Sequence, residues 1–290
     1  MKDVNFITKI RQGKDLSFFI LVSLLSLFMA VPLFAIILEV LVKGYSQLNF
    51  DFFTQTAPTT YEAMMARDAG GVIPGGIVNG ILGTIFMVVS SAVLAIPIGI
   101  AGGVYLAENA NSRIAGVVRF LTELIQGTPS IIVGVIVYAW IVVPFKSYSA
   151  LAGAVSLAIM MLPLIVRSTE ETLKMLPSSL KEAGLALGGS YASVVLKVLL
   201  PAAFNGIFTG TLLAISRVIG ETAPLMITAL GSTMINWDLL SPTSAVSLLI
   251  WEFYNDPNLV SLIWSSSLFL LILVLTLNIT AKYMVYRSSK

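Results

Sequence analysis

Arg217 and Glu221 are two charged residues in an otherwise apolar stretch of the sequence, residues 202–230. A charge at the centre of a membrane-spanning helix costs about 2.5–3.5 kcal/mol on insertion scales, so it needs a partner or a function. The spacing of four residues places both side chains on one face of a helix, where they can pair. Arginine also offers two parallel N–H donors to a tetrahedral oxyanion. The pair is therefore interpreted either as an ion pair that fixes helix packing or as a contact for an anionic substrate.

A helix break is predicted next to this pair. Pro224 has no N–H to donate to the carbonyl of Gly220, and a freed carbonyl is tolerated inside a membrane only against protein or a water-filled cavity. Gly206 and Gly210 lie one turn apart on a single helical face. Small residues of this kind suit close helix packing or the lining of a passage.

Three more polar residues are candidates for the same pathway. Arg167 precedes Glu170 and Glu171, which can neutralise it on a helix; alternatively, its head group reaches the membrane interface. Glu123 lies just before a Gln-Gly-Thr-Pro-Ser sequence that contains Thr128 and interrupts an apolar stretch. Broken helices with serine or threonine often line transport sites, although Glu123 equally suits the inner membrane interface.

The composition excludes several kinds of site. The chain has 290 residues, no histidine and no cysteine. It can therefore hold no Ser-His-Asp triad, thiol nucleophile, disulfide, or metal or haem site built from those residues. It is 57% hydrophobic and 11% charged, whereas soluble domains carry about 25% charged residues. The net charge of +2 is too small to indicate nucleic-acid binding. The sequence therefore predicts a membrane protein and no nucleic acid as partner.

Long apolar stretches predict an all-α, polytopic membrane protein. Six of them are long enough to cross about 30 Å of hydrocarbon at about 1.5 Å per residue. They are residues 16–42, 77–107, 117–143, 150–166, 202–230 and 259–283. The first is too long for the core of a signal peptide, so it is expected to remain as a transmembrane helix.

The basic residues predict the orientation. The N-terminal tail is residues 1–15. Thirteen of the 17 Lys and Arg residues lie in the two tails and in the two connections on the same side of the membrane, whereas three lie on the other side. This bias predicts that both termini are cytoplasmic. The outer connections, 43–76 and 231–258, flank a core at 77–230, and the last helix with its tail occupies 259–290. The aromatic residues of the second outer connection form either an interfacial belt or a docking surface for an outer partner.

The long cytoplasmic connection, residues 168–201, is predicted to fold as a helical hairpin. Ser179 and Glu182 fit a capping box that begins a two-turn helix. Gly188 ends that helix, because glycine accepts the left-handed conformation that follows a helix. A second helical segment then leads into the next span. Local physics leaves open whether the hairpin lies on the membrane surface or inserts into another protein.

One motif of this connection resembles the EAA loop of ABC importer permeases. It consists of Glu182-Ala183-Gly184, then Gly188 after three residues, then Val198-Leu199-Leu200-Pro201 after nine more. Two residues depart from the family pattern: Gly184 replaces an alanine and Val198 an isoleucine. The resemblance implies a type I ABC importer permease fold, in which this loop forms the coupling helix that docks in a groove of a cytoplasmic ATPase. It implies that Glu182 and Gly188 shape this helix and that Ala183 packs at the joint.

The chain has no ATP site of its own. Gly13-Lys14 is followed by Asp15, and no glycine precedes Gly13 by five residues, so the P-loop pattern is absent. The chain is therefore expected to be a non-catalytic subunit that binds no cofactor. ATP and magnesium are expected in a separate ATPase subunit.

Three further segments resemble the PstA-type permease subunits of phosphate ABC importers. They are Arg217-Val218-Ile219-Gly220-Glu221-Thr222-Ala223-Pro224-Leu225, the segment from Leu162-Pro163 through Arg167-Ser168-Thr169-Glu170-Glu171 to Pro177, and Gly75-Gly76-Ile77 with Asn79-Gly80-Ile81 and Gly83-Thr84. In that family the arginines matching Arg167 and Arg217 are implicated in phosphate transport. Glu221 is expected to neutralise Arg217 at rest and to accept the proton of hydrogen phosphate, which sulfate lacks.

This resemblance implies inorganic phosphate as the substrate and a multi-pass location in the cytoplasmic membrane of a bacterium or archaeon. It implies a PstC-like permease for the other half of the pathway, two copies of a PstB-like ATPase and a PstS-like phosphate-binding protein outside. Three other functions stay open on sequence alone. They are the permease of a sulfate- or molybdate-type ABC importer, an ATP-independent secondary transporter or channel, and an intramembrane enzyme.

Overall fold

The chain is helical throughout most of the part that the structure describes. The computed structural model describes residues 2–288, and the side chains of residues 14–283. The helices are α1 (Lys2–Gly44), α2 (Phe50–Thr54), α3 (Thr60–Asp68), α4 (Val78–Glu108), α5 (Arg113–Gly127), α6 (Ser130–Val137), α7 (Val143–Phe145), α8 (Ala150–Lys174), α9 (Ser178–Ala186), α10 (Tyr191–Val194), α11 (Leu200–Ile219), α12 (Ala223–Met226), α13 (Val246–Tyr254) and α14 (Val260–Ser288). A 3₁₀ turn (Tyr45–Gln47) and two π turns (Tyr138–Val142 and Val195–Leu199) join some of them. Within these residues the only strand-like pairing is a bridge between Leu230 and Thr243.

Five helices in this part of the chain are long and apolar enough to cross a membrane. They are Lys14–Gln47, Val78–Glu108, Ala150–Lys174, Tyr191–Ile219 and Val260–Tyr283. A sixth span is made by Arg113–Gly127 and Ser130–Phe145 together, which meet at a bend of 108°. The predicted count of six spans is confirmed when this bent pair counts as one.

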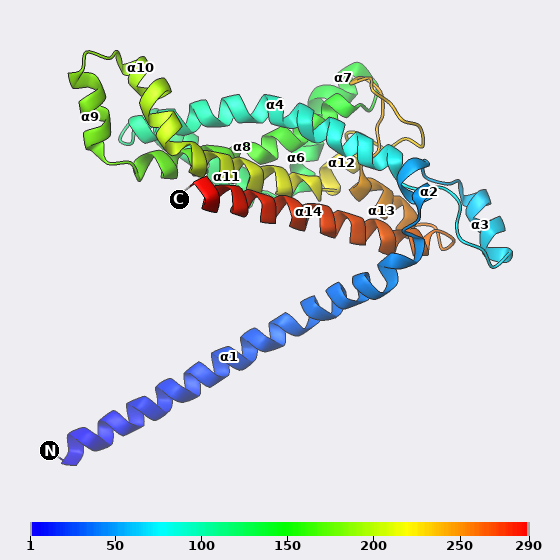
Figure 1. Cartoon of the computed structure of the whole chain (residues 1–290), viewed down its shortest axis with the longest axis horizontal. Coiled ribbons are helices and arrows are strands. Elements are labelled where there is room, and N and C mark those ends of the chain that lie inside the picture. The colour runs from blue at the N-terminus through cyan, green and yellow to red at the C-terminus, as the bar shows by residue number, and fades with distance from the viewer. Residues whose placement is uncertain (1, 289–290) are drawn as a thin grey trace.

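Helix α8 packs between α4 and α11 (Figure 1). The contacts are close because glycines face α8 from both sides. A Cβ on Gly103 of α4 would lie 2.4 Å from the Thr169 Cβ, and one on Gly210 of α11 would lie 2.2 Å from the Ser168 Cβ. Gly206, one turn before Gly210, lies equally close to α8. The small-residue face predicted for the fifth span is therefore used for helix packing.

The fourth span is longer than the sequence predicts. The sequence predicts an end at residue 166, but α8 continues to Lys174. Hydropathy places the end at the first charged residue, Arg167. In the structure the charged side chains of the last two turns pair with one another and with α5, so the helix continues through them.

The fifth span is displaced by eleven residues at both ends, since it runs from Tyr191 to Ile219 rather than over 202–230. Pro201, which directly precedes the predicted start, lies inside the span. In the π turn before Pro201, the N–H of Leu200 bonds to the carbonyl of Val195, five residues back. This wider turn carries the helix past a residue that has no N–H to donate. At the other end, the helix break predicted near the charged pair stops the span early.

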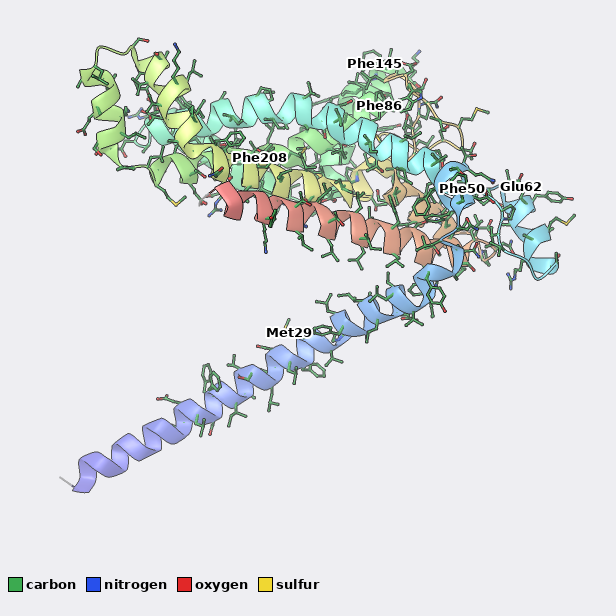
Figure 2. All side chains as sticks on the ribbon, viewed as in Figure 1. Met29, Phe50, Glu62, Phe86, Phe145 and Phe208 are labelled. Atoms are coloured by element: carbon green, nitrogen blue, oxygen red, sulfur yellow. The ribbon has the colours of Figure 1, made fainter. Side chains whose placement is uncertain are left out.

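Helix α1 lies apart from the bundle. Figure 1 shows it leaving at an angle from the end that holds α2 and α3, and Figure 2 shows its side chains, Met29 among them, projecting around the helix with no other element beside them over most of its length. It contacts the bundle at its last turn, where Gly44 lies against Leu268 of α14. Because so large an apolar surface is unfavourable in water, lipid or another apolar surface must cover α1.

The two ends of the bundle differ in construction. Helices α9 and α10 project from one end, and α2, α3 and α13 lie at the other (Figure 1). At the second end, the side chain of Asn79 links the two outer connections. It accepts a hydrogen bond from the Ala57 N–H at 3.2 Å and donates one to the Ser232 carbonyl at 2.8 Å. Helix α1 begins, and α14 ends, toward the end that holds α9.

We expect Gly210→Ala to weaken the contact between α8 and α11. The new Cβ would lie 2.2 Å from the Ser168 Cβ, a clash that no rotation of the Ser168 hydroxyl removes. The loss of stability, measured by thermal unfolding of the purified protein in detergent, should be about 1–3 kcal/mol. Gly116→Ala is the matched control, because a Cβ there meets nothing within 4 Å and alanine favours a helix. Equal melting temperatures for the two variants would contradict this packing.

Candidate functional site

The first candidate pair lies at the end of α11. Arg217 is in the last turn, and the helix ends at Ile219, before Glu221. The predicted ion pair is present but loose, with the Arg217 Nε 3.9 Å from the Glu221 Oε1. The Arg217 side chain is 48% exposed and that of Glu221 is 18% exposed. The prediction that both residues share one face of a continuous helix is wrong, because α11 ends between them.

The break predicted at Gly220 and Pro224 coincides with the gap between α11 and α12. Pro224 lies in the first turn of α12, where a missing N–H leaves no helical bond unmade. The hydroxyl of Ser247 on α13 donates to the carbonyl of Glu221 at 2.8 Å. The break is therefore stabilised by protein groups, as the membrane interior requires.

Close packing holds α12 in place against α6 and α8. A Cβ on Gly134 of α6 would lie 2.7 Å from the Cα of Pro224. On α8, a Cβ on Gly153 would lie 3.2 Å from a methyl group of Leu225. Any larger residue at Gly134 would have to displace the backbone of α12. The position of the chain beside Arg217 is thus set by glycine contacts with two other helices.

A second helix break separates α5 from α6, at the interruption that the sequence predicts. Helix α5 ends at Gly127 and α6 begins at Ser130. The Thr128 hydroxyl donates to the Leu124 carbonyl at 2.6 Å, so this side chain satisfies a carbonyl in the last turn of α5. Pro129 follows, and the chain turns by 108°.

A polar cavity of about 210 Å³ lies between α5 and α8. It is lined by Arg119, Thr122, Glu123, Gln126, Pro163, Val166, Arg167, Glu170, Glu171 and Lys174. The structure therefore brings together two of the predicted pathway residues, Glu123 and Arg167. The other three, Thr128, Arg217 and Glu221, do not line this cavity.

Glu170 joins the two walls of the cavity. Its side chain is 9% exposed, and one carboxylate oxygen accepts hydrogen bonds from Arg119 (Nη2 at 2.7 Å, Nε at 2.9 Å) and from the Lys174 Nζ at 2.5 Å. The two cations compensate the charge of a nearly buried carboxylate, which would be costly if it were unpaired. Because Arg119 lies on α5 and Glu170 on α8, this cluster ties the broken span to the central helix.

Arg167 has a separate partner. Its Nε lies 2.8 Å from the Glu171 Oε1, and the two side chains are 60% and 62% exposed. Of the two carboxylates predicted to neutralise Arg167, Glu171 forms the ion pair. Glu170 forms its ion pairs with Arg119 and Lys174 and acts on Arg167 only through space. Among the described residues Glu123 forms no hydrogen bond or ion pair, although its charge acts on Arg167 through space.

Arg119 and Lys174 are members of this cluster that were not predicted from the sequence. The spacing of four residues between Glu170 and Lys174 is a local signal that predicts their ion pair on a helix. Arg119 and Glu170 are 51 residues apart, so no local pattern connects them. Their contact follows only from the packing of α5 against α8.

The cavity and the Arg217 site lie at different depths in the bundle. Gly210 packs opposite Ser168, so Arg167 is level with that contact. Arg217 is seven residues beyond Gly210, which corresponds to about 10 Å along the helix axis at about 1.5 Å per residue. It is displaced toward the end of the bundle that holds α13. The two arginines therefore form two successive positive positions along the bundle.

The helix predicted in the cytoplasmic connection is present as α9, but the capping box predicted for its start is not formed. Helix α9 begins at Ser178 with Pro177 as N-cap, and no side chain caps it. Ser179 therefore lies inside the first turn, because the helix starts earlier than the capping box requires. The side chain of Glu182 is exposed and remains accessible to a partner.

Gly188 ends α9 as predicted, with a φ of +82°. Its N–H donates to the Leu185 carbonyl at 2.9 Å. This bond belongs to the turn in which a left-handed glycine follows the last residues of a helix. Gly184 lies at the joint with α10, where a Cβ would come within 3.0 Å of the methyl groups of Val194. Ala183 is exposed. Within this chain the packing expected of Ala183 is thus made by Gly184, the residue that departs from the family pattern.

Relatives of known identity match most of this chain. Residues 99–290 match the family described as binding-protein-dependent transport system inner membrane component. The chain is 36% identical over 247 residues to the phosphate transport system permease protein PstA of Haemophilus influenzae, with 84% of each chain covered. It is 33% identical over 277 residues to the probable PstA of Methanocaldococcus jannaschii, with 94% of each covered. The chain belongs to the PstA family.

This PstA-family chain has the fold of an ABC importer permease. It is similar to a structure of the methionine ABC transporter MetNI in an inward-facing conformation, with a TM-score of 0.61 and 24% identity. The similarity covers 72% of this chain and 94% of that one. The predicted all-α, polytopic fold class is confirmed.

We expect Glu170→Gln to destabilise the protein and Glu171→Gln to leave its stability nearly unchanged. The first substitution leaves Arg119 and Lys174 without a compensating charge at a nearly buried position, which should cost about 1–3 kcal/mol. The second removes an exposed pair, whose contribution is about 0–1 kcal/mol. Thermal unfolding in detergent compares the two. Equal losses would show that Glu170 does not hold α5 to α8.

Proposed function

We propose that this chain is the PstA-type permease subunit of an ATP-driven importer of inorganic phosphate. It would form half of the translocation pathway, in the cytoplasmic membrane of a bacterium or archaeon. The observation that carries the proposal is the extent of the similarity to PstA proteins, which reaches 36% identity over 84% of the chain and 33% over 94%. The absence of histidine and cysteine and of a P-loop agrees with a subunit that performs no chemistry of its own.

The proposed complex contains three other kinds of subunit. A PstC-like permease supplies the other half of the pathway, and two copies of a PstB-like ATPase bind ATP and magnesium. A PstS-like protein delivers phosphate from outside. The coupling helix α9 projects from one end of the bundle with Glu182 and Ala183 exposed (Figure 1), as docking to the ATPase requires.

The proposed orientation places both termini and α9 in the cytoplasm. Thirteen of the 17 basic residues fall on that side and three on the other, which is the bias expected for cytoplasmic loops. The end that holds α2, α3 and α13 then faces outward. In this orientation phosphate reaches the level of Arg217 before it reaches the cavity that contains Arg167.

Arg217 is proposed to hold a phosphate oxygen during passage. Its Nε is 3.9 Å from Glu221, beyond hydrogen-bond distance, so the guanidinium donors are not committed to that carboxylate. The fork of a guanidinium matches two oxygens of a tetrahedral anion. Arg167 and Glu123 are proposed to act at the inner cavity, and Thr128 to stabilise the bend beside it.

Glu221 is proposed to balance Arg217 at rest and to accept a hydrogen bond from the protonated oxygen of hydrogen phosphate. Sulfate has no proton at neutral pH, so its oxygens would meet an acceptor rather than a donor. An unpaired carboxylate against an unprotonated oxyanion is repulsive, which provides discrimination against an anion of the same shape.

We expect Arg217→Ala to reduce ATP-dependent phosphate uptake about tenfold or more, because a charge-assisted contact to the anion is lost. Uptake is measured in proteoliposomes that contain the assembled complex. Arg113→Ala is the control, since Arg113 is exposed on α5 and forms no ion pair among the described residues. Undiminished uptake by the Arg217 variant would remove Arg217 from the pathway.

We expect Glu221→Gln to weaken the preference for phosphate over sulfate by about tenfold, because the amide can donate to an unprotonated oxygen. Sulfate competition against phosphate binding is measured on the purified complex without the PstS-like protein, so that only the permease selects the anion. An unchanged preference would mean that Glu221 does not contact the protonated oxygen.

A further inference from the structure

We infer that the last turn of α4 links the coupling helix α9 to the cavity between α5 and α8, through two charged junctions made by Lys181 and Arg119. The inference rests on the proposed function, because it concerns how movement of α9 reaches the pathway. It gives positioning roles to residues that lie outside the EAA pattern.

The first junction joins α9 to α4. The Lys181 Nζ forms an ion pair with the carboxylate of Glu108, the last residue of α4. The Glu108 side chain is 14% exposed, and the Tyr191 side chain lies close to its carboxylate. The Lys181 ammonium lies 5.1 Å from the centre of the Tyr191 ring. One partly buried ion pair, with an aromatic ring beside it, therefore fixes α9 and α10 to the same point on α4.

The second junction joins the same turn of α4 to α5 and α8. The Arg119 Nη1 donates to the Ala110 carbonyl at 2.9 Å, and Nη2 donates to the Leu106 carbonyl at 3.1 Å. These carbonyls lie at and just beyond the C-terminal end of α4, where a cation is favourable. The same guanidinium holds Glu170 of α8 at 2.7 Å.

The two junctions act on one short segment at the end of α4, because Glu108 lies between Leu106 and Ala110 in the sequence. Helix α9 is also attached to α8 through residues 175–177, but a three-residue loop limits distance more than direction. The Lys181 junction fixes the direction of α9, and the Arg119 junction transfers that position to the wall of the cavity. A displacement of α9 by the ATPase would thus move α4, α5 and α8 together.

The test compares phosphate imported with ATP hydrolysed in proteoliposomes that contain the complete complex. Lys181→Met and Glu108→Gln each remove the first junction without removing a residue that lines the cavity. We expect hydrolysis to continue and the ratio of phosphate to ATP to fall about five- to tenfold, which is the lower end of the usual coupling between two sites. Lys197→Met is the matched control, since Lys197 lies on the same connection, is exposed and forms no pair within the described residues.

A swap of the two charges tests the pair itself. Lys181→Glu combined with Glu108→Lys should recover most of the ratio that each single change loses, as expected when the interaction rather than either residue is responsible. Arg119→Lys should lower the ratio as well, because an ammonium cannot hold three oxygens with the geometry of a guanidinium, whereas Arg113→Lys should not. Co-purification of the ATPase confirms that each complex is assembled.

A wild-type ratio of phosphate to ATP in Lys181→Met and Glu108→Gln would overturn the inference. It would also be overturned if the single variants lower the ratio and the charge swap does not restore it. An equal fall in hydrolysis and import would also overturn it, because that result indicates slower turnover with intact coupling. These outcomes are distinct from failure of the proposed function, in which the unmodified complex imports no phosphate.

Discussion

Close contact between α8 and its neighbours α4 and α11 is the constraint on which the rest of this structure depends. In a lipid environment the hydrophobic effect does not bring helices together, so packing must do so, and small residues allow the closest approach. Gly103 and Gly210 provide that approach on the two sides of α8. The position of the cavity, and the depth of each arginine, follow from the register that these glycines set.

Close packing also brings partners to the two helix breaks. A backbone group freed inside a membrane needs a partner within the protein. The Thr128 hydroxyl provides one at the bend between α5 and α6, and the Ser247 hydroxyl provides one beside Glu221. Both breaks lie near the residues proposed to meet phosphate. The charged residues differ in this respect. Glu170 is held by two cations, whereas Arg217 keeps a loose contact and accessible donors.

Much of this arrangement could be predicted from the sequence, since the relevant patterns are local. Apolar length gave six spans, and Gly188 and Pro224 marked places where a helix must end. Helix ends were less accurate, because hydropathy does not detect the paired charges after Arg167 or the π turn before Pro201. The Arg119–Glu170 and Lys181–Glu108 contacts join residues 51 and 73 positions apart. No local periodicity predicts such pairs, which depend on how whole helices pack.

We propose that this chain provides a phosphate pathway whose energy comes from a separate ATPase. Phosphate accumulation in proteoliposomes that contain the permease pair, the ATPase and the binding protein is the most direct test of this proposal. We expect accumulation above the external phosphate concentration with ATP, and none when the ATPase is inactive or ATP is absent. Accumulation without ATP, or of sulfate in place of phosphate, would show that the proposal is wrong.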